Sequence, residues 1–294
     1  MYRSILVPLD RSSFAEQALP LALGIARRGN VPLDLVEVHA LYALENPLAG
    51  RLPFDKNEDA EWKQQEQVYL DATAKWATAA SPLRVTTAVL SGSVALPESV
   101  AASILERTRA ANVDLIVMTT HGRGVLGRLA LGSVADELIR NARVPVLLMR
   151  PIENAVGPVP EPVFDSILIP LDGSVLAEQI LEPAVELARL MESRCTLMRV
   201  VESPSQKPQA EAYLERVAGR IREKGLDVRT RVVIALHVAE AILNEAAAQP
   251  CSVIAVATHG RGALGRLLFG SVADQLIRTR TAPVLVCRAS ESTR

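Results

Sequence analysis

The sequence predicts an α/β protein made of two tandem domains, each a doubly wound, five-stranded parallel sheet. Three observations support this fold class. The segment 120–150 returns 138 positions later as 258–288, and the two copies agree at 21 of 31 places. Short β-branched runs alternate with longer amphipathic stretches in each half, which is typical of a parallel sheet covered on both faces. The runs Asp114–Met118 and Ser252–Val256 are apolar, as buried parallel strands are.

The first half is expected to alternate strands and helices from its start. Short β-branched runs predict the strands, and longer amphipathic stretches predict the helices. The predicted strands are Ser4–Leu9, Leu33–His39, Arg84–Leu90, Asp114–Thr119 and Pro145–Met149. The predicted helices are Ser13–Arg28, Glu58–Ala80, Pro97–Ala110 and Ser133–Asn141, of which the second is long and polar.

The second half repeats the pattern after a change of composition. Residues 151–162 carry four prolines and a glycine, which predicts an extended linker. We therefore expect domains at 1–150 and 164–294, joined by a linker over 151–163. The predicted strands of the second domain are Ser166–Leu171, Cys195–Val200, Asp227–Ile234, Ser252–Ala257 and Pro283–Cys287.

The bulk composition favours a cytoplasmic protein. The net charge of −1 gives no general attraction to nucleic acid or to an anionic membrane, so neither is an expected partner. No apolar run reaches the roughly 18 residues that cross a bilayer, and the N-terminus begins with a strand rather than a signal peptide. The cysteines (Cys195, Cys251 and Cys287) lie in apolar runs, which favours buried free thiols over a disulfide.

The first half is longer than the second between its second and third strands. The extra residues include Tyr42–Asp55 and a longer helix. Within that helix Trp62, Tyr69 and Trp76 recur every seven residues and therefore share a face. We expect this stripe to pack in the core or at a domain interface, and stacking on a ligand is the alternative.

The repeated glycine loop matches two known phosphate-binding motifs only in part. Gly122–Gly127 and Gly260–Gly265 fit G-x-G-x-x-G, but they follow the fourth predicted strand and lack the acidic residue of a dinucleotide site. The two glycines before Ser133 are spaced as in a P-loop that lacks its lysine. Dehydrogenase chemistry and P-loop hydrolysis are therefore both disfavoured.

What remains is a helix N-terminus preceded by small residues. Its first backbone N–H groups have no intrahelical acceptors and form a site for an anion. Gly132 lets the backbone approach a phosphate and Ser133 donates a hydroxyl, a pattern that Gly270 and Ser271 repeat. A capping box with Ser133 as N-cap and Asp136 at the third position is the competing interpretation. Capping does not explain why glycines and arginines recur in both loops, so anion binding is favoured.

Each half also ends its first strand with an aspartate. Asp10 and Asp172 lie where ligands bind in a doubly wound sheet, beyond the carboxyl ends of the strands, and a carboxylate there accepts from ribose or adenine. A turn before the following helix is the alternative role. His121 and His259 have no second ligand at metal spacing, so we expect a hydrogen bond that orders the loop rather than a metal site.

These motifs resemble those of the universal stress proteins, arranged as a tandem pair and covering both halves apart from the linker and Tyr42–Asp55. The ATP-binding branch of that family carries Gly-x2-Gly-x9-Gly-Ser. The later part of this signature matches Gly122, Gly132 and Ser133, and again Gly260, Gly270 and Ser271. The family's first glycine falls on Thr119 and on Ala257. The resemblance implies Rossmann-like domains with strand order 3-2-1-4-5 and an adenine nucleotide between strands 1 and 4.

The resemblance also implies which residues hold the nucleotide. The end of the first strand meets the ribose or adenine, the backbone after the second strand meets the adenine edge, and the glycine loop with the helix start holds the phosphates. In the first half the positions are Pro8, Leu9, Asp10, Ala40, Thr119, Gly122, Arg123, Gly132, Ser133 and Val134. In the second half they are Pro170, Leu171, Asp172, Val200, Ala257, Gly260, Arg261, Gly270, Ser271 and Val272.

The expected function is an ATP-binding stress-response or regulatory protein that holds adenine nucleotide in each domain, with or without Mg²⁺. A slow ATPase or other nucleotide-processing enzyme and a nucleotide-free interaction scaffold are the alternatives. No catalytic residue and no protein metal site is predicted, so any hydrolysis is expected well below the roughly 1–100 s⁻¹ of dedicated phosphoryl-transfer enzymes.

The two domains are expected to pair internally as a pseudo-dimer through their fifth strands, lying antiparallel. An exposed apolar strand edge invites aggregation, and pairing removes it. A homodimer formed through the same strands is the alternative.

Overall fold

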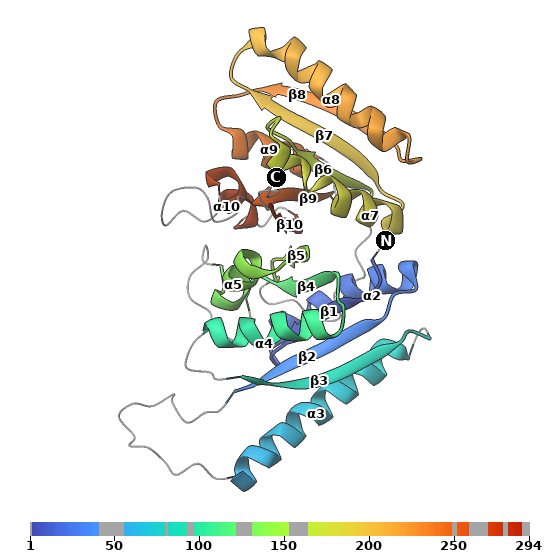
Figure 1. Ribbon diagram of the computed structural model, residues 1–294, viewed down its shortest axis with the longest axis vertical. Coiled ribbons are helices and arrows are strands. Elements are labelled where there is room, and N and C mark those ends of the chain that lie inside the picture. The colour runs from blue at the N-terminus through green and yellow to red at the C-terminus, as the bar shows by residue number, and fades with distance from the viewer. Residues whose placement is uncertain are drawn as a thin grey trace, which may run out of the picture.

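The computed structural model contains one ten-stranded sheet that runs through both halves of the chain (Figure 1). The structure describes residues 2–40, 56–79, 82–92, 97–121, 131–152, 164–248, 252–258, 270–278 and 282–289. The first half occupies one end of the sheet and the second half the other, and they meet in the middle (Figure 1). Most of the predicted linker lies outside the described residues.

Each half contributes five strands in the predicted order. The first half supplies β1 (Ile5–Leu9), β2 (Leu33–Ala40), β3 (Val85–Gly92), β4 (Leu115–Thr119) and β5 (Val146–Met149). The second supplies β6 (Ser166–Pro170), β7 (Arg194–Val201), β8 (Val228–Ile234), β9 (Ser252–Thr258) and β10 (Val284–Arg288). The strand order is β3-β2-β1-β4-β5-β10-β9-β6-β7-β8, parallel within each half. The predicted fold class and the 3-2-1-4-5 order are therefore confirmed.

Helices cover both faces of this sheet. They are α1 (Ser13–Glu16), α2 (Ala18–Gly29), α3 (Lys56–Thr78), α4 (Pro97–Ala110), α5 (Ser133–Asn141), α6 (Val175–Glu178), α7 (Leu181–Met191), α8 (Lys207–Arg222), α9 (Val238–Ala248) and α10 (Ser271–Ile277). A short 3₁₀ turn, η1 (Pro204–Gln206), precedes α8. Among the described residues, none of these helices is both long and apolar enough to span a membrane.

The predicted helix Ser13–Arg28 is interrupted in the structure. It forms α1 and α2, which meet at Gln17. Pro20 has no amide hydrogen, so it cannot donate to the carbonyl of residue 16, and one intrahelical bond is lost at this point. Pro183 is likewise the third residue of α7, but it lies one position further from the end of the preceding short helix than Pro20 does, so it cannot donate to the Gln179 carbonyl. The same interruption in both halves therefore follows from the proline in each copy.

Two apolar layers fill the space between sheet and helices. One packs α2 and α7 against the sheet, with Leu21, Ile25 and Leu187 almost completely buried. The other packs α4, α5, α9 and α10 against the opposite face, with Leu138 and Leu276 buried in it. Each layer contains residues of both halves, so the hydrophobic core continues across the domain boundary.

The two halves join through the predicted pair of fifth strands. β5 and β10 run antiparallel, with Leu147 opposite Leu285. The Tyr2 hydroxyl donates to the Pro183 carbonyl at 2.9 Å, and the Arg150 guanidinium donates to the Arg278 carbonyl at 2.9 Å. The predicted internal antiparallel pairing is confirmed, and backbone hydrogen bonds occupy the edges that it joins.

The aromatic stripe on α3 is mostly exposed, contrary to the prediction. Trp62 is 40% and Trp76 is 54% exposed, while Tyr69 packs against the core and its hydroxyl donates to Glu16. The buried line of α3 passes one position later, through Leu70 and Ala77. Because each helical position turns by about 100°, the tryptophans lie at the side of the buried face rather than on it.

The cysteines that the structure describes are free thiols. Cys195 is buried in β7 and Cys287 is half-buried in β10. Burial raises the pKa of Cys195 to about 12. Cys251 lies outside the described residues.

Candidate functional site

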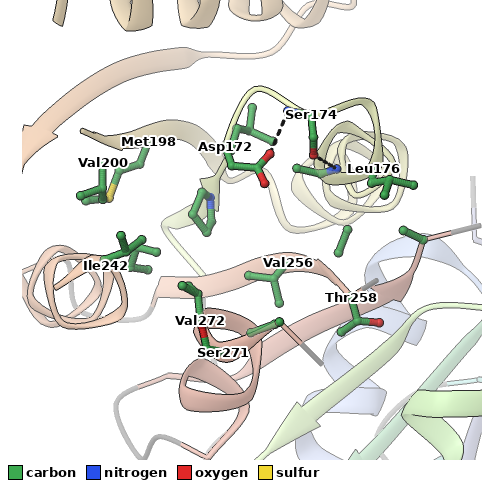
Figure 2. A pocket seen from close by; sticks show the side chains of 18 residues that line it. Asp172, Ser174, Leu176, Met198, Val200, Ile242, Val256, Thr258, Ser271 and Val272 are labelled. Carbon is green, nitrogen blue, oxygen red and sulfur yellow. Dashed lines mark hydrogen bonds between the residues drawn. The ribbon is translucent and has the colours of Figure 1, made fainter. Parts of the chain in front are cut away.

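A cavity of about 340 Å³ opens at the carboxyl ends of β6 and β9 in the second half (Figure 2). β6 pairs with β7 on one side and with β9 on the other, so the strand order reverses its direction at β6. This is the switch point of a doubly wound sheet, where such folds bind ligands. Its walls are mostly apolar, which is usual for a small-molecule site.

The predicted site residues of the second half that the structure describes all line this cavity. They are Pro170, Leu171, Asp172, Val200, Ala257, Gly270, Ser271 and Val272. Gly260 and Arg261 lie outside the described residues. In Figure 2 Asp172 comes from the end of β6, while Ser271 and Val272 come from the start of α10. The structure therefore gathers residues of β6, β7, β9 and α10 around one cavity.

The strand-end aspartates make the turn that the competing interpretation expected of them. The Asp172 Oδ1 atom accepts from the Ser174 N–H at 2.8 Å, and the Ser174 hydroxyl accepts from the Ala177 N–H at 3.1 Å (Figure 2). Asp10 Oδ1 accepts in the same way from the Ser12 N–H at 3.0 Å. The turn in the second half uses only Oδ1, so Oδ2 of Asp172 is left for a group in the cavity.

The competing interpretation of a capping box at Ser133 is wrong, and the start of α10 has no such cap either. Gly132 and Gly270 are the N-caps, and neither α5 nor α10 has a side-chain cap. Asp136 instead accepts from Arg140 at 2.7 Å, and Asp274 accepts from Arg278 at 2.9 Å. These arginines balance the carboxylates that would otherwise repel an anion at the helix start.

Three backbone N–H groups precede the first intrahelical bond of each of these helices. That bond runs from the Asp274 N–H to the Gly270 carbonyl at 3.0 Å, and the matching bond in α5 measures 2.9 Å. The groups before it in α10 belong to Ser271, Val272 and Ala273, which all line the cavity. The helix therefore presents donors and the positive end of its dipole to the cavity.

Gly132 has a structural role that the sequence did not reveal. Its N–H donates to the Thr120 carbonyl at 2.8 Å, and a Cβ atom built on it would lie 2.7 Å from that oxygen. The close approach that requires glycine is thus to the chain's own backbone. Gly132 therefore brings the start of α5 close to the end of β4, and its approach to a phosphate stays a prediction.

The equivalent positions of the first half surround the carboxyl ends of β1 and β4. Asp10 follows β1, Thr119 ends β4, and Ala40 ends β2. The Thr119 hydroxyl donates to the His121 carbonyl at 2.8 Å, a contact that Ala257 in the other copy has no hydroxyl to make. Pro8 and Leu9 end β1, while Gly132, Ser133 and Val134 open α5. Gly122 and Arg123 lie outside the described residues.

The strand register corrects one correspondence between the copies. Pro8 pairs with Val36, and Pro170 pairs with Met198, so Met198 is the counterpart of Val36. Two residues further on, Val200 corresponds to Val38 and not to Ala40. The pairing of Ala40 with Val200 as equivalent positions is therefore wrong.

Histidine at the glycine loop makes the kind of contact that was expected. The Thr120 hydroxyl and His121 Nδ1 lie 2.9 Å apart, which ties the ring to the end of β4. His259 lies outside the described residues. In the part of the chain that the structure describes, no group of three or more His, Cys, Asp or Glu side chains is arranged to hold a metal ion.

Several cavity residues were missed by the sequence reasoning. Met198 lines the cavity from β7, Val238 and Ile242 from α9, and Val256 from β9. Two signals were available: Met198 alternates with Val200 on one face of a strand, and Val238 and Ile242 are four apart on a helix.

Comparison with known proteins agrees with this arrangement. The model of the universal stress protein family matches residues 1–150 and 164–288. The chain belongs to the universal stress protein family. Its two matched segments correspond to the two halves of the sheet.

Individual relatives support the tandem form of this family member. A universal stress protein of Mycobacterium tuberculosis is 32% identical over 190 residues, which cover 60% of this chain and 62% of that relative, so the match spans less than two thirds of the relative's length. One from Mycolicibacterium smegmatis is 26% identical over 302 residues, covering 97% and 96%. The crystal structure of a universal stress protein from Archaeoglobus fulgidus matches at TM-score 0.75 and 20% identity, covering 98% of both chains, and shows the fold.

Proposed function

We propose that this universal stress protein is a cytoplasmic ATP-binding regulatory protein of the stress response, with one adenine-nucleotide site in each domain. The observation that carries the proposal is the cavity at the β6 switch point, bounded by Asp172 and by the start of α10. It combines apolar side chains for the base, a carboxylate acceptor for the ribose and N–H donors for the phosphates.

The apolar walls suit a purine base. Met198, Val200, Ile242 and Val256 come from three elements and leave space between them (Figure 2). The cavity volume of about 340 Å³ is at the lower end of the range of ligand pockets, roughly 300–1,000 Å³. We therefore assign the enclosed part to the base and ribose, with the phosphates directed toward the helix start.

The polar groups suit the ribose and phosphates. Oδ2 of Asp172 is an acceptor for ribose hydroxyls, and an ionised acceptor makes a stronger hydrogen bond than a neutral one. The N–H groups of Ser271, Val272 and Ala273 are donors for phosphate oxygens, and the Ser271 hydroxyl adds another. In the first half Asp10, Ser133 and Val134 stand in the same places.

Nucleotide holding is a better match to this donor set than nucleotide turnover. Fast phosphoryl transfer requires a metal, a positioned water and added positive charge. The described residues around the cavity supply donors for a bound anion, and Asp172 is assigned to the ribose. Any Mg²⁺ would therefore arrive with the phosphates, and hydrolysis is expected to be slow in a phosphate-release assay with excess Mg-ATP.

Calorimetric titration of the whole chain with ATP tests the proposal. We expect two sites per chain, and we expect Asp172→Asn and Asp10→Asn each to weaken one site at least about tenfold, about 1.4 kcal/mol. Asp227→Asn is the matched control, because Asp227 precedes β8 at the opposite end of the strands. No heat, and no displacement by ADP up to about 1 mM, would contradict nucleotide binding.

A further inference from the structure

The first half contains a cluster of six charged side chains between β2 and α3. We call it the His39 cluster, and its members are Arg11, Glu37, His39, Asp59, Lys63 and Glu66. Within it, His39 Nδ1 lies 2.7 Å from a Glu66 oxygen and His39 Nε2 lies 2.8 Å from an Asp59 oxygen. Arg11 donates to Glu37 at 2.8 Å and contacts Glu66 at 3.4 Å. Lys63 donates to Asp59 at 2.8 Å.

Both ring nitrogens of His39 lie at hydrogen-bond distance from carboxylate oxygens, and the ring donates to two ionised carboxylates only when it carries two protons. A neutral imidazole has one donor nitrogen and one acceptor nitrogen, whereas both ring nitrogens of His39 face carboxylate oxygens. The side chains of His39 and Glu66 are each only 4% exposed, so water does not substitute for a missing bond. With a charged His39 the cluster holds three positive and three negative groups, and without that charge it holds one uncompensated buried carboxylate.

Asp59 shows the same dependence from the other side. Hydrogen bonds from Lys63 and His39 hold the pKa of Asp59 below its ordinary value. Asp59 is therefore an ionised acceptor, and a neutral His39 that donates to it would leave Glu66 Oε2 without the imidazole donor, so that only the longer contact of Glu66 with Arg11 remained.

The cluster is connected to two segments of the proposed first site. Arg11 directly follows Asp10 and has φ of 62°, in the left-handed region that a residue with a side chain rarely adopts. His39 directly precedes Ala40 at the end of β2. The ion pairs of Arg11 with Glu37 and Glu66 therefore hold the turn that carries Asp10.

The second half has no such cluster at the equivalent positions. The strand register places Arg199 where the first half has Glu37, and Val201 where it has His39. Tyr69 and Tyr213 are matched because each donates to the glutamate of the preceding short helix, which places Ala210 where the first half has Glu66. A proton-dependent effect at this place is thus confined to one of the two sites.

We propose that His39 is a positioning residue of the first nucleotide site and makes that site alone respond to pH. This inference rests on the proposed function. As pH rises, the imidazolium loses a proton and one of its two carboxylate bonds. Glu66 then competes with Glu37 for the Arg11 guanidinium, and the turn that carries Asp10 shifts away from the position that binds ribose.

Two further ionisable groups, Glu16 and Tyr69, lie near the cluster. Glu16 on α1 accepts from Tyr69 on α3, and burial, followed by Glu16 and then Glu37, raises the pKa of that tyrosine. On β3, the neighbours of Glu37 and His39 are Val89 and Ser91, which do not titrate. Histidine is the side-chain type that changes charge between about pH 5 and 8, and the side chains that face His39 in the cluster are carboxylates, an arginine and a lysine.

Single-site proteins give the direct test. Asp172→Ala leaves the first site and Asp10→Ala leaves the second, and ATP affinity is measured for each between about pH 5 and about pH 8. We expect the ratio of first-site to second-site affinity to fall at least about tenfold over this range. ATP ionisation affects both sites and leaves that ratio unchanged.

Three variants of the Asp172→Ala protein identify the residue. His39→Gln should remove the pH dependence, because the amide does not titrate. Glu66→Gln should preserve affinity at high pH, because its amide donates to a neutral imidazole, and it serves if His39→Gln fails to fold. His237→Gln is the control, since His237 is exposed beyond β8 in the second half, and it should leave the pH profile unchanged.

A nucleotide-free measurement separates failure of the inference from failure of the proposed function. Nitrogen-15 NMR of the histidine rings in the intact chain should show two ring protons on His39 at about pH 6, and protection of the Arg11 and Ser12 amides should fall with that titration relative to Gly173 and Ser174. If neither site binds ATP, the proposed function fails and this measurement decides the inference. One ring proton on His39 at that pH, or identical pH profiles at the two sites, would overturn it.

Discussion

In both halves an arginine supports the loop after the first strand, but it lies in the loop itself in the first half and on the neighbouring strand in the second. In the first half the loop residue itself, Arg11, reaches Glu37 on β2. In the second half the loop residue is Gly173, with φ of 92°, and the guanidinium comes from Arg199 on β7. The Arg199 guanidinium lies 3.1 Å from where a Cβ of Gly173 would be, and 5.2 Å from the centre of the Tyr213 ring.

The difference shows what the shared backbone requires and what it leaves free. A left-handed residue beside a guanidinium is kept in both copies, although the residue that supplies the charge has changed. The first half builds this support from buried ion pairs, and the second builds it from glycine and an aromatic ring. The two copies of one fold therefore depend on different interactions at the same place, and four measurements test that contrast.

The largest effect is expected where the halves are alike and joined. Leu147→Ala and Leu285→Ala each empty a fully buried position at the β5–β10 pair, and each should lower the free energy of unfolding by about 2–5 kcal/mol. Because the core is continuous, denaturant unfolding of both variants should remain a single transition in fluorescence and circular dichroism. Val68→Ala on the exposed face of α3 is the control. Two separate transitions would show that the halves are independent units.

Removing the arginine that supports this loop should destabilise the chain more in the first half than in the second. Arg11→Ala leaves Glu37 buried without this ion pair, and it should cost about 2 kcal/mol after allowance for the partly exposed guanidinium. Arg199→Ala loses stacking on Tyr213, worth about 0.5–1 kcal/mol. Chemical denaturation of both variants measures the difference. Equal losses would mean that burial of the carboxylate does not decide the cost.

Glycine substitutions should act in opposite directions at two positions. Gly132→Ala places a Cβ against the Thr120 carbonyl and should destabilise the chain by about 1–2 kcal/mol. Gly219→Ala in α8 meets nothing within 4 Å and should stabilise it by about 0.5–1 kcal/mol. Thermal melting of the two variants gives the signs. A neutral Gly132→Ala would show that the start of α5 moves away from β4 without cost.

The smallest effect distinguishes Cys195 from its counterpart Leu33. Burial raises the folded pKa of Cys195 to about 12, above the roughly 8.5 of an unfolded cysteine. The thiol contributes stability that is complete below about pH 8.5 and is lost as pH rises toward the folded value. Near pH 9 the loss should be under about 1 kcal/mol, and Cys195→Leu should remove it. A pH profile of unfolding that is identical for both proteins would contradict this.

The sequence predicted the strands well because their signal is local. β4 and β9 are apolar runs, and the structure places each within one residue of its predicted bounds. The cavity wall formed by Met198 and Ile242 was not predicted, because it depends on which strand face meets which helix. The strand-end aspartates and helix-start serines were identified from their places at strand ends and helix starts, from their repetition in both halves and from the family resemblance.

Features set by contacts between distant segments were beyond the pattern. Helical spacing placed Trp62 and Trp76 on one face, but only packing shows that Leu70 and Ala77 face the sheet. Capping by Ser133, the alternative to anion binding, is wrong because the N-cap is Gly132, whose N–H donates to the Thr120 carbonyl. The bonds of His39 join β2 to positions 20 and 27 residues further along the chain, and no spacing rule predicts them.

The antiparallel contact between β5 and β10 has a further consequence in terms of effective concentration. β5 and β10 belong to one chain, in which only a short segment separates Ile152 of the first half from Phe164 of the second. The two strands therefore meet as if each were present at about millimolar concentration. A contact too weak to join two separate molecules at lower concentrations is therefore sufficient here. Substitutions in β5 and β10 that would dissociate a two-chain assembly can therefore persist in this chain. The sequence of this interface can change while the ten strands stay in one sheet.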